Sequence, residues 1–246
     1  MLRAPMPAPG ERSARWWRRK RVLVPLVSFV SLALVAAIVW WAWLPRYRPE
    51  LRQGESYGVD VSNHQREIDW AAVAADDIEF AYLKATEGGD FVDPWFERNW
   101  AGARSAGLDV GAYHYFTLCR SGSQQAENFL ATVPVQEAGL PAALDLEFAG
   151  NCSQRPTRQW VHDEVAQFMQ IVEDATGSDV LLYVGSEFDE MYGITDTLGG
   201  PLWQRRILQR PDGDRWVIWQ LTFFSDVDGI DGGVDLDVRR ESPPPP

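Results

Sequence analysis

Residues 141–147 read Pro-Ala-Ala-Leu-Asp-Leu-Glu, an apolar run that ends in two carboxylates one residue apart. In a β-strand the side chains at positions i and i+2 point to the same face, so Asp145 and Glu147 would share one wall of a pocket. Two acids held that close disfavour simultaneous ionisation, and one of them keeps its proton near neutral pH. The segment therefore predicts a strand with a proton donor at its carboxyl end.

Similar strand-like runs recur along the chain and alternate with helical patterns, a rhythm typical of β/α units and a largely parallel sheet. The predicted strands span residues 57–62, 80–86, 109–116, 141–147, 179–185, 202–207, 215–221 and 234–238. Helices are predicted over residues 68–75, 95–105, 123–132 and 157–175, and Gly107 and Gly177 stand where helix C-caps belong. Eight strands favour a closed α/β barrel, irregular toward its end because the last connections are short.

The acids fall at positions where such a barrel gathers its chemistry, the carboxyl ends of the strands. Asp60 lies late in the first predicted strand, Asp145 and Glu147 close the fourth, and Asp235 or Asp237 belongs to the last. First and last strands are neighbours in a closed barrel. We therefore expect acids from three strands to converge on one mouth.

Aromatic residues accompany the acids on the same strands. Five are candidates: Tyr82, Tyr113, Tyr115, Tyr183 and Trp219. Aromatic faces beside carboxylates suit a sugar ring, which offers apolar faces and hydroxyl edges. For each residue the alternative is a place in the barrel core.

The two cysteines, Cys119 and Cys152, follow the third and fourth strands, so both would lie on the same rim in adjacent loops. A disulfide there suits an oxidising compartment and would stiffen the loops beside Glu147. The three histidines are scattered, as structural histidines often are, and no spacing suggests zinc. The acidic run 226–233 fails the register of a calcium loop and is interpreted as a turn, so we expect neither a metal ion nor a cofactor.

The N-terminal part differs in character from the rest. Residues 22–44 carry no charge and are long enough to cross a bilayer as a helix, after a basic segment, residues 1–21. Seven Lys and Arg precede the apolar run and three follow it before residue 53, which favours a cytoplasmic N-terminus. We expect a single-pass anchor in the inner membrane, with a periplasmic or extracellular domain; a cleaved signal peptide is the competing interpretation.

Charge is divided between these two parts. Residues 1–53 hold 10 Lys and Arg against 2 Asp and Glu, a net +8, whereas residues 54–246 hold 13 against 33, a net −20. So acidic a domain repels polynucleotides, which excludes nucleic acid as an expected partner.

Several short motifs together resemble the glycoside hydrolase family 25 lysozymes, which cleave peptidoglycan as N-acetylmuramidases. The matching segments occur in the family's order and lie at residues 57–62, 82–88, 111–116, 126–129, 144–147, 219–220 and 234–236. The resemblance implies an irregular β/α barrel of eight strands with fewer helices, over residues 55–240. Residues 45–54 would then be a linker, and residues 241–246 a Pro-rich tail.

The resemblance also implies roles for the candidate residues. Glu147 would be the general acid, Asp145 its partner, and Asp60 and Asp235 further acids of the site. Tyr82, Tyr113, Tyr183 and Trp219 would bind the sugar, with peptidoglycan glycan strands as the partner. The chain departs from the family pattern at 204–206, where Gln-Arg-Arg replaces a more typical small residue and aromatic.

Three functions are compatible with these residues. The first is a membrane-tethered muramidase, and the second is a binding module that holds glycan in the same groove without cleaving it. The third is a phosphoesterase whose acids hold a divalent ion. Retention of Glu147 favours the first, because a binding groove has no need of a proton donor.

Overall fold

The computed structural model describes the backbone of residues 9–240 and the side chains of residues 23–240. The chain divides into two compact units, Met1–Tyr47 and Arg48–Pro246. The predicted tail, residues 241–246, and the first eight residues of the predicted basic segment lie outside the described residues.

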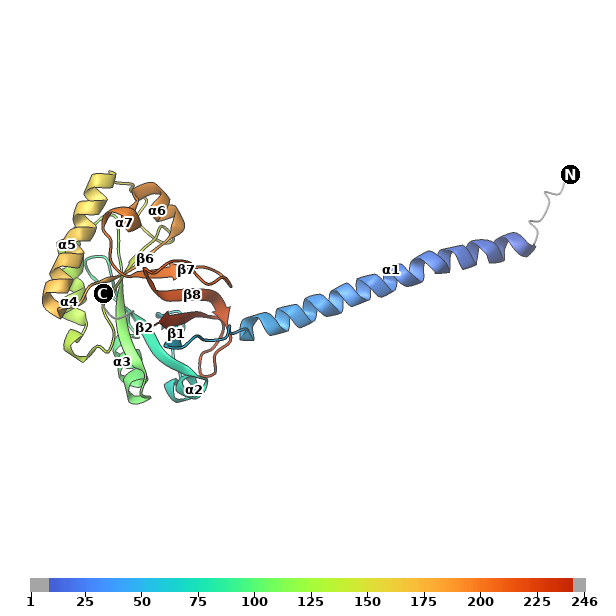
Figure 1. Ribbon diagram of the computed structural model, residues 1–246, viewed down its shortest axis with the longest axis horizontal. Coiled ribbons are helices and arrows are strands. Elements are labelled where there is room, and N and C mark those ends of the chain that lie inside the picture. The colour runs from blue at the N-terminus through green and yellow to red at the C-terminus, as the bar shows by residue number, and fades with distance from the viewer. Residues whose placement is uncertain (1–8, 241–246) are drawn as a thin grey trace. The chain divides into compact units, whose positions relative to one another are not determined.

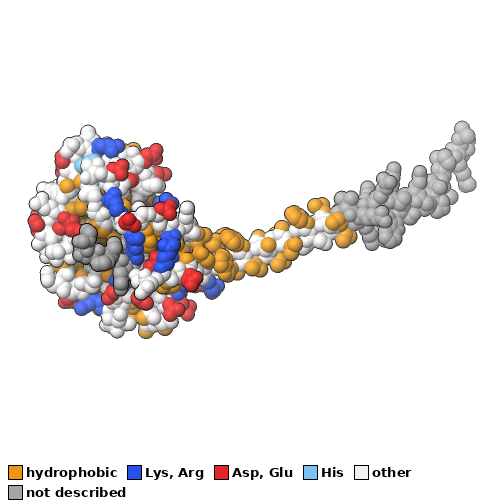
Figure 2. Space-filling model, in the orientation of Figure 1, with side chains coloured by type: hydrophobic (Ala, Val, Ile, Leu, Met, Phe, Trp, Pro, Cys, Tyr) orange, Lys and Arg blue, Asp and Glu red, His pale blue; other side chains and the backbone are white. Residues whose placement is uncertain are grey.

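The first unit consists of one long helix, α1 (Pro9–Trp43), and a short 3-10 helix, η1 (Leu44–Arg46). Its segment Leu23–Arg46 is 24 residues long and apolar enough to cross a membrane. The large apolar side chains of its part within α1, residues 23–43, are 48 to 79% exposed, and Figure 2 shows them along the described part of the helix. α1 is therefore not a core helix; it has the length and composition of a membrane anchor or a signal sequence.

The predicted linker, residues 45–54, is not a free tether along its whole length. The Arg48 guanidinium donates a hydrogen bond to the Asp76 carboxylate at 2.5 Å, and the Tyr57 hydroxyl donates to the carbonyl of Pro49. From Arg48 onward the chain therefore belongs to the second unit.

The second unit is a closed barrel of eight strands (Figure 1), as predicted, with a short ninth strand beside it. Around the barrel the order is β2, β4, β5, β6, β7, β8, β9 and β1, and pairing of β1 with β2 closes the ring. The strands span Glu55–Val61 (β1), Ile78–Glu87 (β2), Phe91–Val92 (β3), Asp109–Tyr115 (β4), Ala143–Leu146 (β5), Leu181–Val184 (β6), Leu202–Arg205 (β7), Trp216–Ser225 (β8) and Val234–Arg240 (β9). The sequence did not predict β3, which pairs with the end of β2.

The last strand is the exception in a largely parallel barrel. β9 runs antiparallel to both β8 and β1, and its register places Asp235 opposite Asp60. The beginning of β9, and not its end, therefore lies at the same rim as the carboxyl ends of the other strands.

Helices cover only part of the barrel, in agreement with the predicted irregularity. Their bounds are Trp70–Ala75 (α2), Phe96–Ser105 (α3), Gly122–Thr132 (α4), Arg158–Thr176 (α5), Ser186–Tyr192 (α6) and Ile194–Thr197 (α7). Figure 1 shows α4 and α5 beside each other on one flank of the barrel. The sequence predicted α2 to α5 but neither α6 nor α7, and Gly177 ends α5 in the left-handed conformation at φ 71°.

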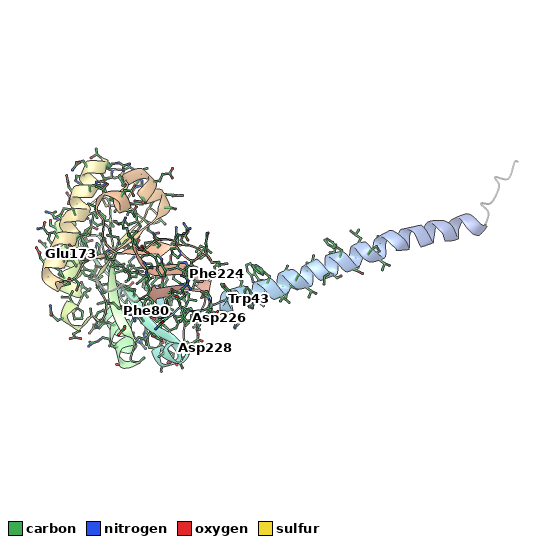
Figure 3. All side chains as sticks on the ribbon, viewed as in Figure 1. Trp43, Phe80, Glu173, Phe224, Asp226 and Asp228 are labelled. Carbon is green, nitrogen blue, oxygen red and sulfur yellow. A yellow bond between two sulfur atoms is a disulfide. The ribbon has the colours of Figure 1, made fainter. Side chains whose placement is uncertain are left out.

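The barrel interior below the mouth is filled by large side chains that face glycines across the sheet. Phe80 and Tyr82 of β2 pack with Trp203 of β7, and the Tyr82 and Trp203 rings lie 4.9 Å apart. Phe80, labelled in Figure 3, is fully buried. A Cβ atom at Gly58 or Gly111 would overlap the ring of Phe80 or Tyr82, respectively. Large rings that lie over glycines of the adjacent strands thus fill the interior and form the floor of the cavity above it.

Candidate active site

A cavity of about 440 Å³ opens at the barrel mouth. All four acids predicted from the sequence, Asp60, Asp145, Glu147 and Asp235, line it. Asp145 lies in β5 with Glu147 directly beyond the strand, Asp60 lies in β1, and Asp235 lies in β9. The barrel therefore brings together carboxylates from three segments that are far apart in the sequence.

Asp145 and Glu147 occupy alternate positions at the end of β5. Asp145 pairs in register with Tyr115 of β4 and Tyr183 of β6, and its Oδ1 atom is buried without a hydrogen-bond partner among the described residues. Alternation of side chains turns both carboxylates to the interior. Asp145 and Glu147 therefore lie on the same wall of the cavity, as their spacing in the sequence predicted.

Asp60 is held on the opposite side of the cavity by a chain of hydrogen bonds. The Gln220 amide donates to Asp60 Oδ2 at 3.1 Å, and the Tyr183 hydroxyl donates to Gln220 Oε1 at 3.1 Å. The strand pattern alone left open whether Asp235 or Asp237 belongs to the site, and the family resemblance implied Asp235. Asp235 lines the cavity, whereas Asp237 is fully buried below it and accepts a hydrogen bond from the Trp203 indole at 3.0 Å.

The shared burial of these acids raises their pKa values. Burial raises the pKa of Asp60 well above its usual range, and the charges of Asp235 and Asp237 raise it further. Burial and the charge of Glu147 do the same to the pKa of Asp145. Burial also raises the pKa of Asp235, to about 7. Protons are therefore retained in this cluster at a pH where exposed carboxylates have lost them.

Opposing effects act on the pKa of Glu147. Burial raises its pKa, whereas the positive charges of Arg205 and Lys84 oppose the shift. A carboxylic acid that keeps its proton and still faces an open cavity can protonate a leaving group.

Of the four predicted sugar-binding aromatics, two line the cavity and two do not. Tyr113 and Tyr183 line it. Tyr82 is 1% exposed and lies in the core, where its hydroxyl donates to the Pro141 carbonyl at 3.0 Å. Trp219 is buried outside the cavity lining and its indole donates to the Arg206 carbonyl at 2.7 Å, because the neighbouring positions of β8, and not position 219, face inward. Trp203, which the sequence did not single out, lines the cavity.

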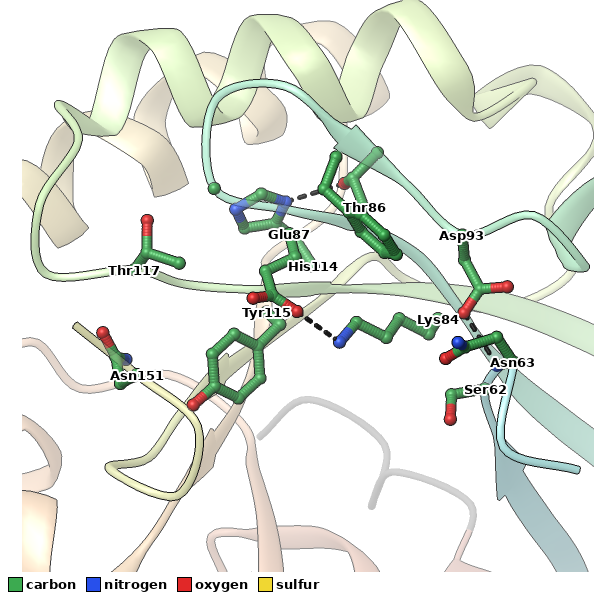
Figure 4. A network of polar contacts seen from close by, with 12 residues as sticks. Ser62, Asn63, Lys84, Thr86, Glu87, Asp93, His114, Tyr115, Thr117 and Asn151 are labelled. Carbon is green, nitrogen blue, oxygen red and sulfur yellow. Dashed lines mark hydrogen bonds and ion pairs between the residues drawn. The ribbon is translucent and has the colours of Figure 1, made fainter.

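A lysine at the mouth of the cavity was not predicted from the sequence (Figure 4). Lys84 forms an ion pair with Glu87 at 2.7 Å, and its ammonium lies 4.8 Å from the centre of the Tyr115 ring. All three residues line the cavity. Lys84 lies two positions after Tyr82 in β2, so both side chains are on the same face of the strand. The strand pattern could therefore have shown that Lys84 faces inward.

Asn151 joins the loops that follow β4 and β5. Its amide donates to the carbonyls of Phe116 at 2.8 Å and Glu147 at 2.9 Å, and its oxygen accepts from the backbone N–H groups of Leu118 at 2.9 Å and Cys152 at 2.8 Å. The predicted disulfide between Cys119 and Cys152 is present in the same two loops. The backbone that carries Glu147 is therefore fixed by one amide and one covalent bond.

His114 has a structural role. It is fully buried between Thr86 Oγ1, at 2.7 Å from Nδ1, and Gln125 Oε1, at 3.1 Å from Nε2, and Figure 4 shows the contact with Thr86. Burial lowers its pKa to about 3, so the ring is neutral. Within the part of the chain that the structure describes, no group of three or more His, Cys, Asp and Glu side chains is arranged to hold a metal ion.

Comparisons with known proteins agree with this geometry. A family profile described as "Glycosyl hydrolases family 25" matches residues 59–230. The chain is 41% identical over 192 residues to "Uncharacterized protein YegX" of Escherichia coli (strain K12), covering 74% of this chain and 68% of that protein. It is 30% identical over 196 residues to "Lysozyme M1" of Streptomyces globisporus, covering 72% of this chain and 65% of that one.

Solved structures show the same fold. The family 25 glycosyl hydrolase from Bacillus anthracis superimposes with a TM-score of 0.70 at 33% identity, over 78% of this chain and 92% of that one. The family profile spans both walls of the cavity, from β1 to the connection before β9. This chain belongs to glycoside hydrolase family 25.

Proposed function

We propose that the barrel hydrolyses the β-1,4 bond between N-acetylmuramic acid and N-acetylglucosamine in peptidoglycan. Membership of family 25 and the similarity to lysozymes support peptidoglycan hydrolysis. The observation that carries the specific assignment is the position of Glu147, a carboxylic acid with a raised pKa at the mouth of an open cavity.

In the proposed mechanism Glu147 protonates the glycosidic oxygen, and the neighbouring carboxylates stabilise the oxocarbenium-like transition state. Asp145 steadies the acetamido group of the substrate as its carbonyl oxygen attacks the anomeric carbon and the bond to the protonated leaving group breaks. The Glu147 carboxylate then takes a proton from the water that opens this cyclic intermediate, and the configuration is retained. The buried, unpartnered Oδ1 of Asp145 supports this assignment, because the acetamido N–H would supply the hydrogen bond that the protein does not. Nucleophilic attack by Asp145 itself is the alternative.

The sugar would lie against the aromatic side chains of the cavity. Tyr113, Tyr183 and Trp203 line the wall on the side of β4, β6 and β7. We assign them to sugar binding, with Trp203 in place of Trp219.

We further propose that residues 22–44 anchor the chain in the inner membrane, with a cytoplasmic N-terminus and the barrel on the far side. The excess of Lys and Arg before the helix supports this orientation. The disulfide between Cys119 and Cys152 suits the oxidising compartment into which the barrel would be exported. A cleaved signal sequence remains the competing interpretation of the same helix.

The decisive experiment compares the native chain, purified in detergent, with Glu147→Gln on purified peptidoglycan. We expect the native chain to release fragments that end in reducing N-acetylmuramic acid, and the variant to be slower by about 10² to 10⁴, the factor that a general acid contributes. Glu79→Gln, which removes an exposed carboxylate outside the cavity, serves as the matched control. Binding of glycan by the native chain without release of any fragment would contradict catalysis and favour the binding module.

A further inference from the structure

Arg205 stands at the end of β7, where the chain departs from the family pattern. It lies two positions after Trp203, whose ring packs in the barrel interior, so both side chains are on the inner face of the strand. Arg205 lines the cavity together with Glu147 and Tyr183, and its side chain is exposed.

The positive charge of Arg205 is available to a ligand, unlike that of Lys84. These two are the Lys and Arg side chains of the cavity lining. Lys84 is occupied by Glu87 at 2.7 Å. The Arg205 guanidinium forms neither a hydrogen bond nor an ion pair with the side chains and backbone of residues 23–240, although its charge acts on Glu147, Asp145 and Asp235.

A free guanidinium beside the reacting bond matches a specific group of the proposed substrate. N-acetylmuramic acid carries a lactyl ether at C3 that ends in a carboxyl group, on the same ring whose anomeric carbon reacts at Glu147. The carboxylate is free where the stem peptide has been removed, and elsewhere the peptide attached there supplies carboxylates. The planar fork of a guanidinium binds a carboxylate through two parallel hydrogen bonds.

The charge of the whole domain makes such a contact important for substrate binding. The domain as a whole has a formal net charge of −20, which repels an anionic substrate. We propose that Arg205 is a specificity-determining residue that binds a carboxylate of the muramyl C3 substituent, and so favours anionic glycan over uncharged glycan. The inference rests on the proposed muramidase function and adds to it the group by which the substrate is selected.

The test compares kcat/KM on matched substrates with the full chain in detergent. Peptide-free and peptide-bearing glycan strands are each prepared with free carboxylates and with the carboxylates converted to methylamides. We expect the native chain to prefer the carboxylate form by roughly tenfold or more, the factor that a charge-assisted hydrogen bond supplies. In Arg205→Gln the ratio should fall to about one.

Arg206→Gln is the matched control, because Arg206 is the adjacent residue, does not line this cavity, and lies 3.9 Å from Asp212. It should keep the native preference. A loss of preference confined to peptide-free strands would identify the lactyl carboxylate, and one confined to peptide-bearing strands would identify the stem peptide. Either supports the proposal.

If Arg205→Gln changes kcat/KM equally on carboxylate and methylamide substrates and shifts the pH profile, the proposal is overturned. Arg205 would then be a residue that only adjusts the pKa of Glu147. A native preference that survives in Arg205→Gln would also overturn the proposal. If the native chain cleaves none of the substrates, the proposed function fails separately; binding of the same four glycans to the native chain and to Arg205→Gln then decides the role of Arg205.

Discussion

At the scale of single residues, the chemistry could be predicted where a side chain's direction follows from strand alternation near a strand end. Asp145 and Glu147 were placed correctly by that argument. Trp219 was not, because residues 216–221 are mostly apolar on both faces, so the pattern does not tell which face is inward. Arg205 was noted only as part of a departure from the family pattern, and its place in the cavity was not predicted, since an arginine at a strand end is equally typical of a solvated surface.

The buried acids make the stability of the barrel depend on pH, and Asp235 allows a quantitative prediction. Its pKa is about 7 when folded and about 3.9 in an unfolded chain, so the folded state binds more protons between these values. Its contribution to the free energy of unfolding is fully present below about pH 4 and is lost as the pH rises through about 7, a loss on the order of 4 kcal/mol. Asp235→Asn, studied by urea unfolding, should match the native chain at pH 4 and exceed it at pH 8.

The exposed residue Asp179 provides the control, since Asp179→Asn removes the same charge at a solvated position. It should follow the native pH dependence. Equal stabilities of the native chain and Asp235→Asn at pH 8 would show that folding does not raise the pKa of Asp235.

At the scale of secondary structure, the eight barrel strands were predictable because each is an apolar run of several residues. β3, α6 and α7 were missed because segments of two, seven and four residues carry too little periodicity. The direction of β9 was not predictable. The predicted strands left residues 222–233 between them, about the dozen that a parallel connection needs, whereas β8 in fact runs on to Ser225 and leaves only residues 226–233.

Gly111 of β4 sets the spacing between the strand and the aromatic floor. A methyl group there would overlap the Tyr82 ring, so Gly111→Ala should lower the free energy of unfolding by about 1 to 3 kcal/mol. Gly139→Ala is the control, because the nearest atom to its added carbon lies 3.5 Å away, at ordinary contact distance. Thermal unfolding of both variants measures the difference, and similar melting temperatures would contradict the packing argument.

Asn151 should matter to both stability and activity because it ties the backbone of Glu147 to the loop after β4. We expect Asn151→Ala to cost about 2 to 4 kcal/mol for the loss of four hydrogen bonds, and to lower kcat more than it raises KM. Ser153→Ala changes an exposed side chain in the same loop and should be neutral. A variant that unfolds like the native chain and keeps its kcat would show that the disulfide and the hydrogen bond from the Tyr115 hydroxyl to the Ala149 carbonyl hold the loops without Asn151.

At the scale of the whole molecule, the two units were predictable from composition, since an uncharged apolar run beside a basic segment differs so clearly from an acidic domain. Their boundary was less predictable. The bond from Arg48 to Asp76 assigns to the barrel a stretch that composition alone marks as linker. Such contacts depend on which side chains the fold brings near, and no local pattern records them.

The topology of the anchor can be tested in cells. If α1 spans the membrane, the chain should stay in the membrane fraction after alkaline extraction, and protease added from outside the inner membrane should reach the barrel. Substituting the basic residues 18–21 should weaken this orientation. Recovery of a shortened, soluble barrel that begins after the helix would instead identify a cleaved signal sequence.

The position of β9 has a consequence for how the protein comes to be active. β9 closes the barrel between β8 and β1, and it carries Asp235 into the cavity. Both events require residues 234–240, which are synthesised after every other strand. A nascent chain therefore has neither a closed barrel nor a complete set of acids, and a wall-degrading activity is withheld until translation has passed the last strand.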